Sequence, residues 1–243
     1  MSNYALKLMF KGTAYSGWQV QKNAVGIQSI VQDAVENVFG ERLGVSGCSR
    51  TDSGVHANEY FCHVKNAPVF DTNKLPLALN THLPRDISVT AAFEVDDSFH
   101  SRYSAKGKEY LYLLWNSKTP NPFHTDTALW YPKYIDCDFA DEVARDFVGK
   151  HDFSAFMAAH SKIKDTVRDV WYFRVEREGD YVKFVVAADG FLYNMVRIMS
   201  GTLLQISNRK IKAPVSSIIN SKQRSNAGMT LPAHGLYLNK VFY

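Results

Sequence analysis

The residues best able to do chemistry stand in one short run, Gly47–Ala57, with the sequence G-C-S-R-T-D-S-G-V-H-A. Arg50 precedes Asp52 by two residues, and a glycine stands on each side of the pair. A nearby guanidinium lowers the pKa of a carboxyl group, and glycines let a backbone or a substrate approach closely. An ionised carboxylate held in this way can act as a nucleophile or as a general base. Taken alone, the pattern also fits a structural Arg–Asp ion pair in a tight turn.

Two further segments combine aromatic side chains with polar or basic ones. Gly12–Gln21 is a glycine-punctuated loop whose aromatic and amide side chains suit contacts with a backbone or a sugar, and equally a structural turn with a buried Trp18. Phe99–Tyr110 mixes basic and aromatic side chains just ahead of a strand. That mixture indicates phosphate neutralisation with a platform for stacking bases, or else a strand edge covered by long charged side chains.

Two segments in the second half of the chain also stand out. His151–Phe156, H-D-F-S-A-F, is predicted to end a helix and begin a loop, with either a cap and packed aromatic rings or a functional role. Phe191–Ile198 places Arg197 inside an otherwise apolar helix. Burying a guanidinium is costly unless an anionic group pairs with it, so this segment favours a functional interpretation.

Composition limits the class of protein. The chain has 243 residues, 46% of them hydrophobic, which is enough for one large or two modest domains with a sizeable core. A formal net charge of +4 permits a nucleic-acid partner without requiring one. The basic residues form three clusters: Arg102, Lys106 and Lys108; Lys162, Lys164, Arg168, Arg174 and Arg177; and Arg209, Lys210 and Lys212.

The sequence gives no sign of a metal site, a disulfide framework or a membrane segment. The three cysteines are widely spaced and the eight histidines are scattered. The N-terminus does not resemble a signal peptide, and the longest apolar stretch, Phe191–Ile206, contains Arg197 and is too short to cross a bilayer. We therefore expect a soluble cytoplasmic protein with no metal and no membrane association.

Hydrophobic periodicity predicts the order β-α-β-β-α-β in each half of the chain. In the first half, Leu6, Leu8 and Phe10 lie on one face of a strand, and a helix from Ile27 ends at Gly40. Later elements are strands near Val45, at Glu59–Val64 and at Ile87–Phe93, and a short helix from Asn73 to Asn80. The second half has strands at Tyr110–Trp115, Val170–Glu176, Tyr181–Ala187 and Leu236–Phe242, and helices with apolar stripes at Phe139–Phe147 and Leu192–Leu203.

These elements predict an α+β fold with two ferredoxin-like halves. We expect their strands to form one extended mixed or antiparallel sheet, with helices on one face and an active-site cleft opposite. The expected division is an N-terminal α/β half at residues 1–105, which carries the Asp52 loop, a strand with a proline-rich crossover at residues 106–140, and a C-terminal α/β half at residues 141–243. Topology alone implies no function.

Read together, the motifs resemble the TruA family of tRNA pseudouridine synthases over nearly the whole chain. The resemblance lies in five ordered elements: Arg50–Ala57, Phe99–Tyr110, His151–Phe156, Gly190–Arg197 and Gly235–Leu238. Ser53 and Ser101 stand where the family usually has alanine. Five elements at family-like spacing are far more specific than any single one.

The resemblance implies that the protein isomerises uridine to pseudouridine without a cofactor, on the 3′ side of the tRNA anticodon stem-loop, at positions 38–40. Asp52 would be the catalytic residue. It would act either as a nucleophile that attacks the uracil or the ribose, or as a general base that removes the ribose 2′ proton, and both roles remain open. Arg50 and Arg197 would keep Asp52 ionised and oriented. Tyr110 would stack on the flipped uracil, Leu238 would supply an apolar wall, and Arg50 or His56 would fill the space left by the base.

Two other functional classes fit parts of the sequence. An RNA-binding module without catalysis would use the sheets and the basic clusters but would not need Asp52. A hydrolase with an aspartyl nucleophile would need a second carboxylate or a metal cluster near Asp52, and no motif supplies one. For the synthase we expect a homodimer, because each basic cluster holds only three to five charges while a tRNA is a long polyanion.

Overall fold

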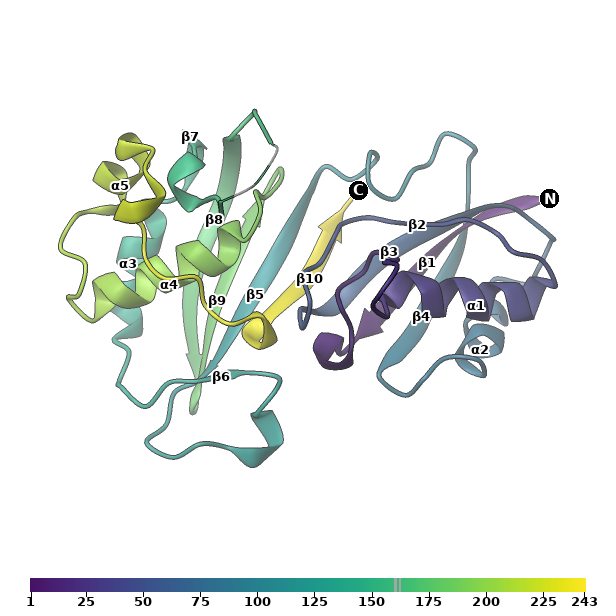
Figure 1. Cartoon of the computed structure of the whole chain (residues 1–243), viewed down its shortest axis with the longest axis horizontal. Helices are drawn as coiled ribbons and strands as arrows, with labels where there is room; N and C mark the ends of the chain where they lie inside the picture. The colour runs from purple at the N-terminus through teal and green to yellow at the C-terminus, as the bar shows by residue number, and fades with distance from the viewer. Residues whose placement is uncertain (160, 162) are drawn as a thin grey trace. The chain divides into compact units, whose positions relative to one another are not determined.

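The computed structural model describes residues 1–159, 161 and 163–243, and Lys162 of the second basic cluster lies outside this range. The chain forms two compact units (Figure 1). Unit 1 comprises Met1–Lys106 and Leu238–Tyr243, and unit 2 comprises Gly107–Tyr237. Both combine helices with mostly antiparallel strands, which confirms the α+β class. The division at residues 105 and 140 stays a prediction.

The sheet of unit 1 is built around strand β1 (Ser2–Phe10). It pairs antiparallel with β3 (His56–Ala67) on one side and β4 (Ile87–Val95) on the other, so that Leu6 lies opposite both Cys62 and Ala92. The short β2 (Val45–Gly47) also pairs with β3. Strand β10 (Leu236–Phe242), which returns the chain to unit 1, lies next to β3.

Helices α1 (Ile27–Phe39) and α2 (Leu75–Asn80) lie beside this sheet (Figure 1). Helix α1 presents an apolar stripe of Ile27, Val31, Ala34 and Val35 to the core, and the ring of Phe39 stacks on Tyr4 of β1 with 6.1 Å between centroids. The helix ends, as predicted, at Gly40, whose φ of 77° is in the left-handed region that favours glycine.

The sheet of unit 2 has the strand order β5-β9-β8-β7. Strands β8 (Val167–Glu178) and β9 (Tyr181–Ala188) form the predicted hairpin, which turns at Gly179. On its other side β9 pairs with β5 (Gly107–Trp115). The crossover after β5 contributes the 3-10 turn η2 (Pro122–His124) and β6 (Leu129–Trp130), which runs parallel to β5.

The described residues of unit 2 include the α-helices α3 (Cys137–Arg145), α4 (Met195–Ser207) and α5 (Val215–Ser221). Nine of the thirteen residues of α4 are buried, which makes it the core helix of the unit. Asp136 caps α3 by accepting a 3.1 Å hydrogen bond from the Phe139 N–H. Short 3-10 segments also occur, at η1 (Gly12–Ala14) in unit 1 and at η3 (Ser154–Phe156), η4 (Arg224–Asn226) and η5 (Ala233–Gly235) in unit 2.

Some predicted elements differ from those observed. The prediction that His151–Phe156 ends a helix was wrong, because α3 stops at Arg145 and a strand, β7 (Gly149–Asp152), pairs with β8 before η3 begins. Helix α5 was not predicted. Strand β3 begins at His56, three residues before the predicted start, so its first residues belong to the candidate catalytic motif.

No helix among the described residues is both long enough and apolar enough to cross a membrane.

Candidate active site

The Arg50–His56 turn in unit 1 is held in place by the Gly12–Trp18 segment, so two separate sequence motifs form one structure. The Gly54 N–H and the Ser53 hydroxyl both donate to the Tyr15 carbonyl, at 3.3 and 3.2 Å. Within the turn, the Val55 N–H donates to the Asp52 carbonyl at 3.2 Å. The backbone on both sides of the Asp52 side chain is therefore tied to a neighbouring loop.

Glycines make this close approach possible. A Cβ on Gly12 would lie 2.0 Å from the Val55 carbonyl oxygen, and one on Gly17 would lie 2.2 Å from the Thr51 carbonyl oxygen. Gly17 also has a φ of +85°, which a larger residue adopts only with strain. These positions have room for no side chain, which explains the glycine punctuation seen in the sequence.

The start of the turn rests on two stacked aromatic rings. Trp18, 3% exposed, stacks on Tyr60 of β3 with 4.2 Å between centroids, and the Tyr60 hydroxyl donates to the Ser49 carbonyl. The backbone N–H of Trp18 donates a hydrogen bond to the Thr51 carbonyl oxygen at 3.4 Å. The burial of Trp18 that one interpretation of Gly12–Gln21 predicted is confirmed. The other interpretation, contacts with a backbone or a sugar, stays a prediction.

The three predicted site residues of this turn differ in exposure. Arg50 is exposed, Asp52 is half-buried and His56 is only 1% exposed. His56 Nδ1 accepts a 2.9 Å hydrogen bond from the Gly12 N–H, which leaves Nε2 to carry the ring proton. His56 thus supports the Gly12 loop, and its contact with a substrate stays a prediction.

Unit 2 contributes Arg197, which lies in the first turn of α4, where the predicted Gly190–Arg197 motif ends. Its Nη1 donates to the Asn194 side-chain oxygen at 2.8 Å and its Nε to the Leu231 carbonyl at 2.7 Å. Asn194 itself adopts a left-handed φ of 58° at the start of the helix. These neutral acceptors fix the direction of the guanidinium. Its pairing with the Asp52 carboxylate stays a prediction.

Tyr110 lies on β5, opposite Val186 of β9, and is 8% exposed. Its ring meets Phe191 at 85° with 5.1 Å between centroids, so the loop before α4 sets the ring orientation. Leu238, on the part of β10 that belongs to unit 1, is fully buried. The substrate-binding roles of both residues stay predictions.

Sequence reasoning missed one supporting pair, Tyr15 and Asp86. The Tyr15 hydroxyl donates to Asp86 Oδ1 at 2.6 Å, and burial together with this carboxylate raises the pKa of Tyr15. The Asp86 carbonyl also accepts from the Lys11 N–H at 2.8 Å. Tyr15 stood in a motif, but no local pattern marked Asp86, which lies 71 residues away.

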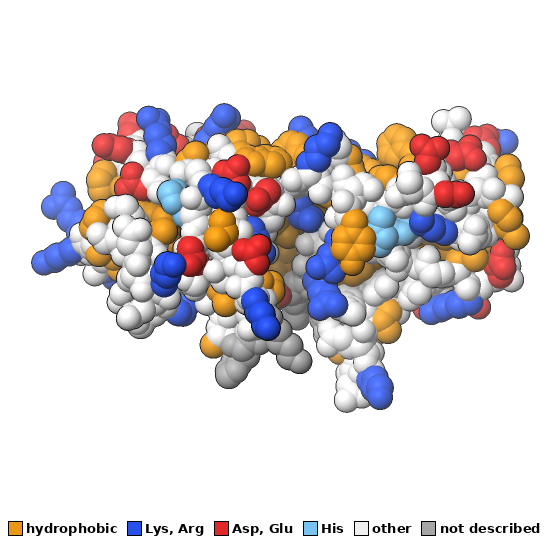
Figure 2. Space-filling view, turned by 90° about the horizontal axis from the view of Figure 1, so that it is seen from above, with side chains coloured by type: hydrophobic (Ala, Val, Ile, Leu, Met, Phe, Trp, Pro, Cys, Tyr) orange, Lys and Arg blue, Asp and Glu red, His pale blue; other side chains and the backbone are white. Residues whose placement is uncertain are grey.

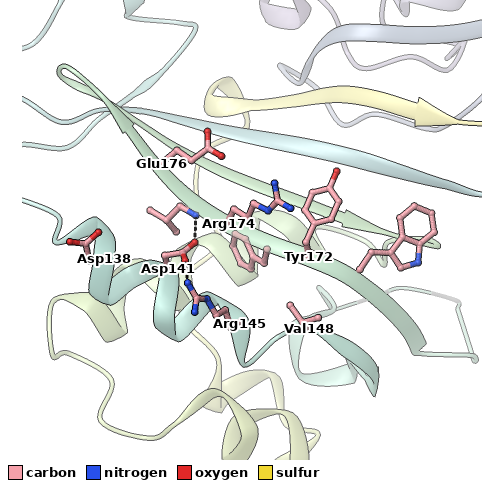
Figure 3. A pocket seen from close by; sticks show the side chains of 10 residues that line it. Asp138, Asp141, Arg145, Val148, Tyr172, Arg174 and Glu176 are labelled. Carbon is pink, nitrogen blue, oxygen red and sulfur yellow. Dashed lines mark hydrogen bonds and ion pairs between the residues drawn. The ribbon is translucent and has the colours of Figure 1, made fainter.

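A hollow on the surface of unit 2 contains none of the predicted site residues. It lies between α3 and the part of β8 that extends past β7 (Figure 3). Here Asp141 accepts from the Val175 N–H at 2.9 Å and pairs with Arg145 at 2.8 Å, so a carboxylate covers an open strand edge. Among the described residues, no group of three or more His, Cys, Asp or Glu is placed to hold a metal ion.

Comparison with known proteins identifies the family. A family model described as tRNA pseudouridine synthase matches residues 8–104 and 143–243. Proteins named tRNA pseudouridine synthase A from Thermoanaerobacter sp. strain X514 and from Clostridium acetobutylicum are 43% and 42% identical, each over 100% of both chains. Among solved structures, a chain from a crystal structure of a Cbf5-Nop10-Gar1 complex aligns with a TM-score of 0.37 and 14% identity over 82% of this chain and 53% of its own, which is too distant to add to the argument. The full-length identity shows that the chain belongs to the TruA family of tRNA pseudouridine synthases, which are isomerases.

Proposed function

We propose that this protein isomerises uridine to pseudouridine on the 3′ side of the tRNA anticodon stem-loop, with Asp52 as the catalytic residue and no cofactor. The observation that supports Asp52 is its turn. A half-buried carboxylate stands on a backbone tied to Tyr15 and Trp18, in a chain of this family. Such preorganisation is what a nucleophile or base needs, because small displacements of a reacting group slow the chemistry steeply.

The reaction needs no added atoms or electrons. The bond between ribose C1′ and uracil N1 breaks, the base turns, and a bond forms between C1′ and C5. C5 then loses a proton and N1 gains one, so product and substrate are isomers. Asp52 would attack the base or the ribose, or remove the ribose 2′ proton, and both routes remain open.

The other predicted residues would act around Asp52. Arg50 and Arg197 would hold the carboxylate in its ionised form, and Tyr110 would stack on the uracil after it leaves the RNA helix. Leu238 would provide an apolar wall. Since His56 is buried and holds the Gly12 N–H, the exposed Arg50 is the better candidate to fill the space that the base leaves.

We further propose a homodimer that works on tRNA in the cytoplasm. On the face that Figure 2 shows, basic and acidic side chains are interspersed and form no broad basic area. One basic side chain of the second cluster, Arg177, is also used internally, where Nη2 donates to Asn116 Oδ1 at 2.7 Å and to the Ile135 carbonyl at 2.9 Å. Affinity for RNA depends on the number of phosphates neutralised, so two protomers would together supply more basic side chains than a single cluster does.

Release of tritium from tRNA labelled at uracil C5 tests the proposal. The wild-type protein should release tritium, and a tRNA with cytidine in place of the uridines on the 3′ side of the anticodon stem-loop should release none. Asp52→Asn should fold and bind tRNA but give no product even in a single turnover. Asp146→Asn, which changes an exposed carboxylate at the end of α3, should behave as wild type.

Other outcomes would contradict either the synthase activity or the role of Asp52. Binding of tRNA without tritium release by the wild-type protein would indicate an RNA-binding module, and free uracil or a cleaved product would indicate a hydrolase. Product formation by purified Asp52→Asn would remove Asp52 from the catalytic role while leaving the synthase activity intact.

A further inference from the structure

We propose that the ring of Tyr103, with Arg102 beside it, is an RNA-binding site in unit 1 that stacks an unpaired base and neutralises a neighbouring phosphate. The inference deepens the proposed function and depends on RNA being the substrate. Tyr103 is 77% exposed and the Arg102 guanidinium carbon lies 5.7 Å from its ring centroid. The segment Phe99–Tyr110 was singled out in the sequence, and no step at Asp52 uses these two side chains.

The exposed ring is the outer end of a row of aromatic side chains. Tyr103 packs on His100 with 4.3 Å between centroids, and His100 packs on His63 at 4.6 Å. Burial, with the charges of His100 and Lys65, lowers the pKa of His63 to about 4, so this ring is neutral near pH 7. The inner face of the row is packed against the protein, and its outer end is open for another ring.

The turn that carries Tyr103 is fixed before any ligand arrives. His100 Nδ1 accepts from the N–H groups of both Arg102 and Tyr103, at 3.1 and 3.3 Å, and the Ser104 N–H donates to the His100 carbonyl at 2.9 Å. A ring held in this way loses little conformational entropy on binding, which increases affinity per contact.

Ser101 anchors the turn to the core of unit 1. Its hydroxyl donates to the Ser46 carbonyl at 2.7 Å, its N–H donates to His63 Nδ1 at 3.1 Å, and its carbonyl accepts from the Tyr243 hydroxyl at 2.7 Å. The hydroxyl bond is one that an alanine at this position would not make. A fully buried anchor under an exposed tyrosine indicates a surface built to present that ring.

The charges around the ring orient the expected ligand. Glu94 and Asp96 line a hollow on the side of Phe99 and Ser104, and their carboxylates would repel phosphates there. Arg102 is exposed, and its guanidinium carbon lies within 5.7 Å of the ring centroid. An RNA strand would therefore stack a base on Tyr103 and place its phosphate toward Arg102, a combination typical of single-stranded RNA recognition.

Binding measurements in the Asp52→Asn background, where no turnover occurs, test this site. Tyr103→Ala should weaken binding of an unmodified tRNA transcript by about 5- to 150-fold, whereas Tyr103→Phe and Tyr103→Trp should bind like the parent. Tyr103→Leu, which keeps apolar area without a π-face, should behave like the Ala variant. Arg102→Gln should reduce the slope of log K against log salt by about 1, while Tyr103→Ala leaves the slope unchanged.

Tyr134 offers a matched control in unit 2, since it is 78% exposed and has the Arg177 guanidinium 5.1 Å from its centroid. Tyr134→Ala should bind tRNA normally, and a fully paired RNA duplex should not distinguish Tyr103→Ala from its parent. Parental affinity in Tyr103→Ala, an equal loss in Tyr134→Ala, or a loss explained by altered oligomeric state in light scattering would overturn the proposal. Wild-type tritium release is measured separately, so failure of the synthase assignment remains distinguishable from failure of this site.

Discussion

The two charged groups proposed to meet at the reaction centre are held in different ways. The Asp52 carboxylate in unit 1 owes its position to a backbone tied down by carbonyl and N–H contacts with the Tyr15 and Trp18 loop. The Arg197 guanidinium in unit 2 owes its position to hydrogen bonds made by its own side chain to Asn194 and Leu231.

This difference predicts which changes each region tolerates. Around Asp52, substitutions at small residues that never touch a substrate should be harmful, because they displace the backbone. Around Arg197, the helix should tolerate a substitution and only the charge and its direction should be lost. In a closely packed turn a new side chain displaces the neighbouring backbone, whereas removal of the Arg197 guanidinium affects only the groups that it contacts.

Arg197→Met should have the largest effect in this comparison, with a loss of about 100- to 1,000-fold in single-turnover rate. Met fits the apolar α4, and the hydrogen bonds lost to Leu231 and Asn194 should cost only about 1 kcal/mol each in the free energy of unfolding. Tritium release sampled over a single turnover measures the rate, and urea denaturation measures the free energy of unfolding. Arg145→Met, on an exposed residue of α3, is the control. A folded Arg197→Met protein with full activity would disprove the proposed pairing with Asp52.

Gly12→Ala should lower stability and rate together, through displacement of the backbone. The new Cβ would lie 2.0 Å from the Val55 carbonyl oxygen, so the turn must move. Overpacking should lower the free energy of unfolding by about 1–3 kcal/mol, and a displacement near 1 Å at Asp52 should reduce the rate by about 100-fold. Gly44→Ala is matched, since a Cβ there meets nothing within 4 Å and should leave stability and rate unchanged. Equal behaviour of the two variants would show that the Asp52 turn does not depend on this contact.

The sequence predicted the order of the main elements because apolar periodicity and glycine signals are local. The helix end at Gly40 and the hairpin at Gly179 follow from such signals. Strand β7 and η3 at His151–Phe156 were missed because a four-residue strand has too short a pattern, and its pairing with β8 comes from distant residues.

The same difference between local sequence signals and long-range contacts applies to the candidate site. Asp52 was predicted as a site residue because its turn carries a dense local motif, and a structural turn with a buried Trp18 was one of two interpretations of its glycine-rich loop. Asp86 could not be identified, since its contact with Tyr15 joins residues far apart in the chain and a lone aspartate carries no signal. The internal use of Arg177 was equally invisible, because composition counts a basic residue without showing its partners.

Tyr15→Phe should have the smallest effect and sharpen the comparison most. The variant keeps the ring and the carbonyl that accepts from Gly54 and Ser53, and loses only the hydroxyl bond to Asp86. A loss of about 1 kcal/mol in the positioning of the turn would slow the single-turnover rate about 5-fold, with the Kd for tRNA unchanged. Asp86→Asn keeps an oxygen acceptor and should retain most of the rate, whereas Asp86→Ala should match Tyr15→Phe. If the two residues act through one hydrogen bond, the double variant Tyr15→Phe with Asp86→Ala should be no slower than either single variant. Additive losses in that cycle, or a weaker Kd with an unchanged rate, would mean that the pair acts elsewhere than on the Asp52 turn.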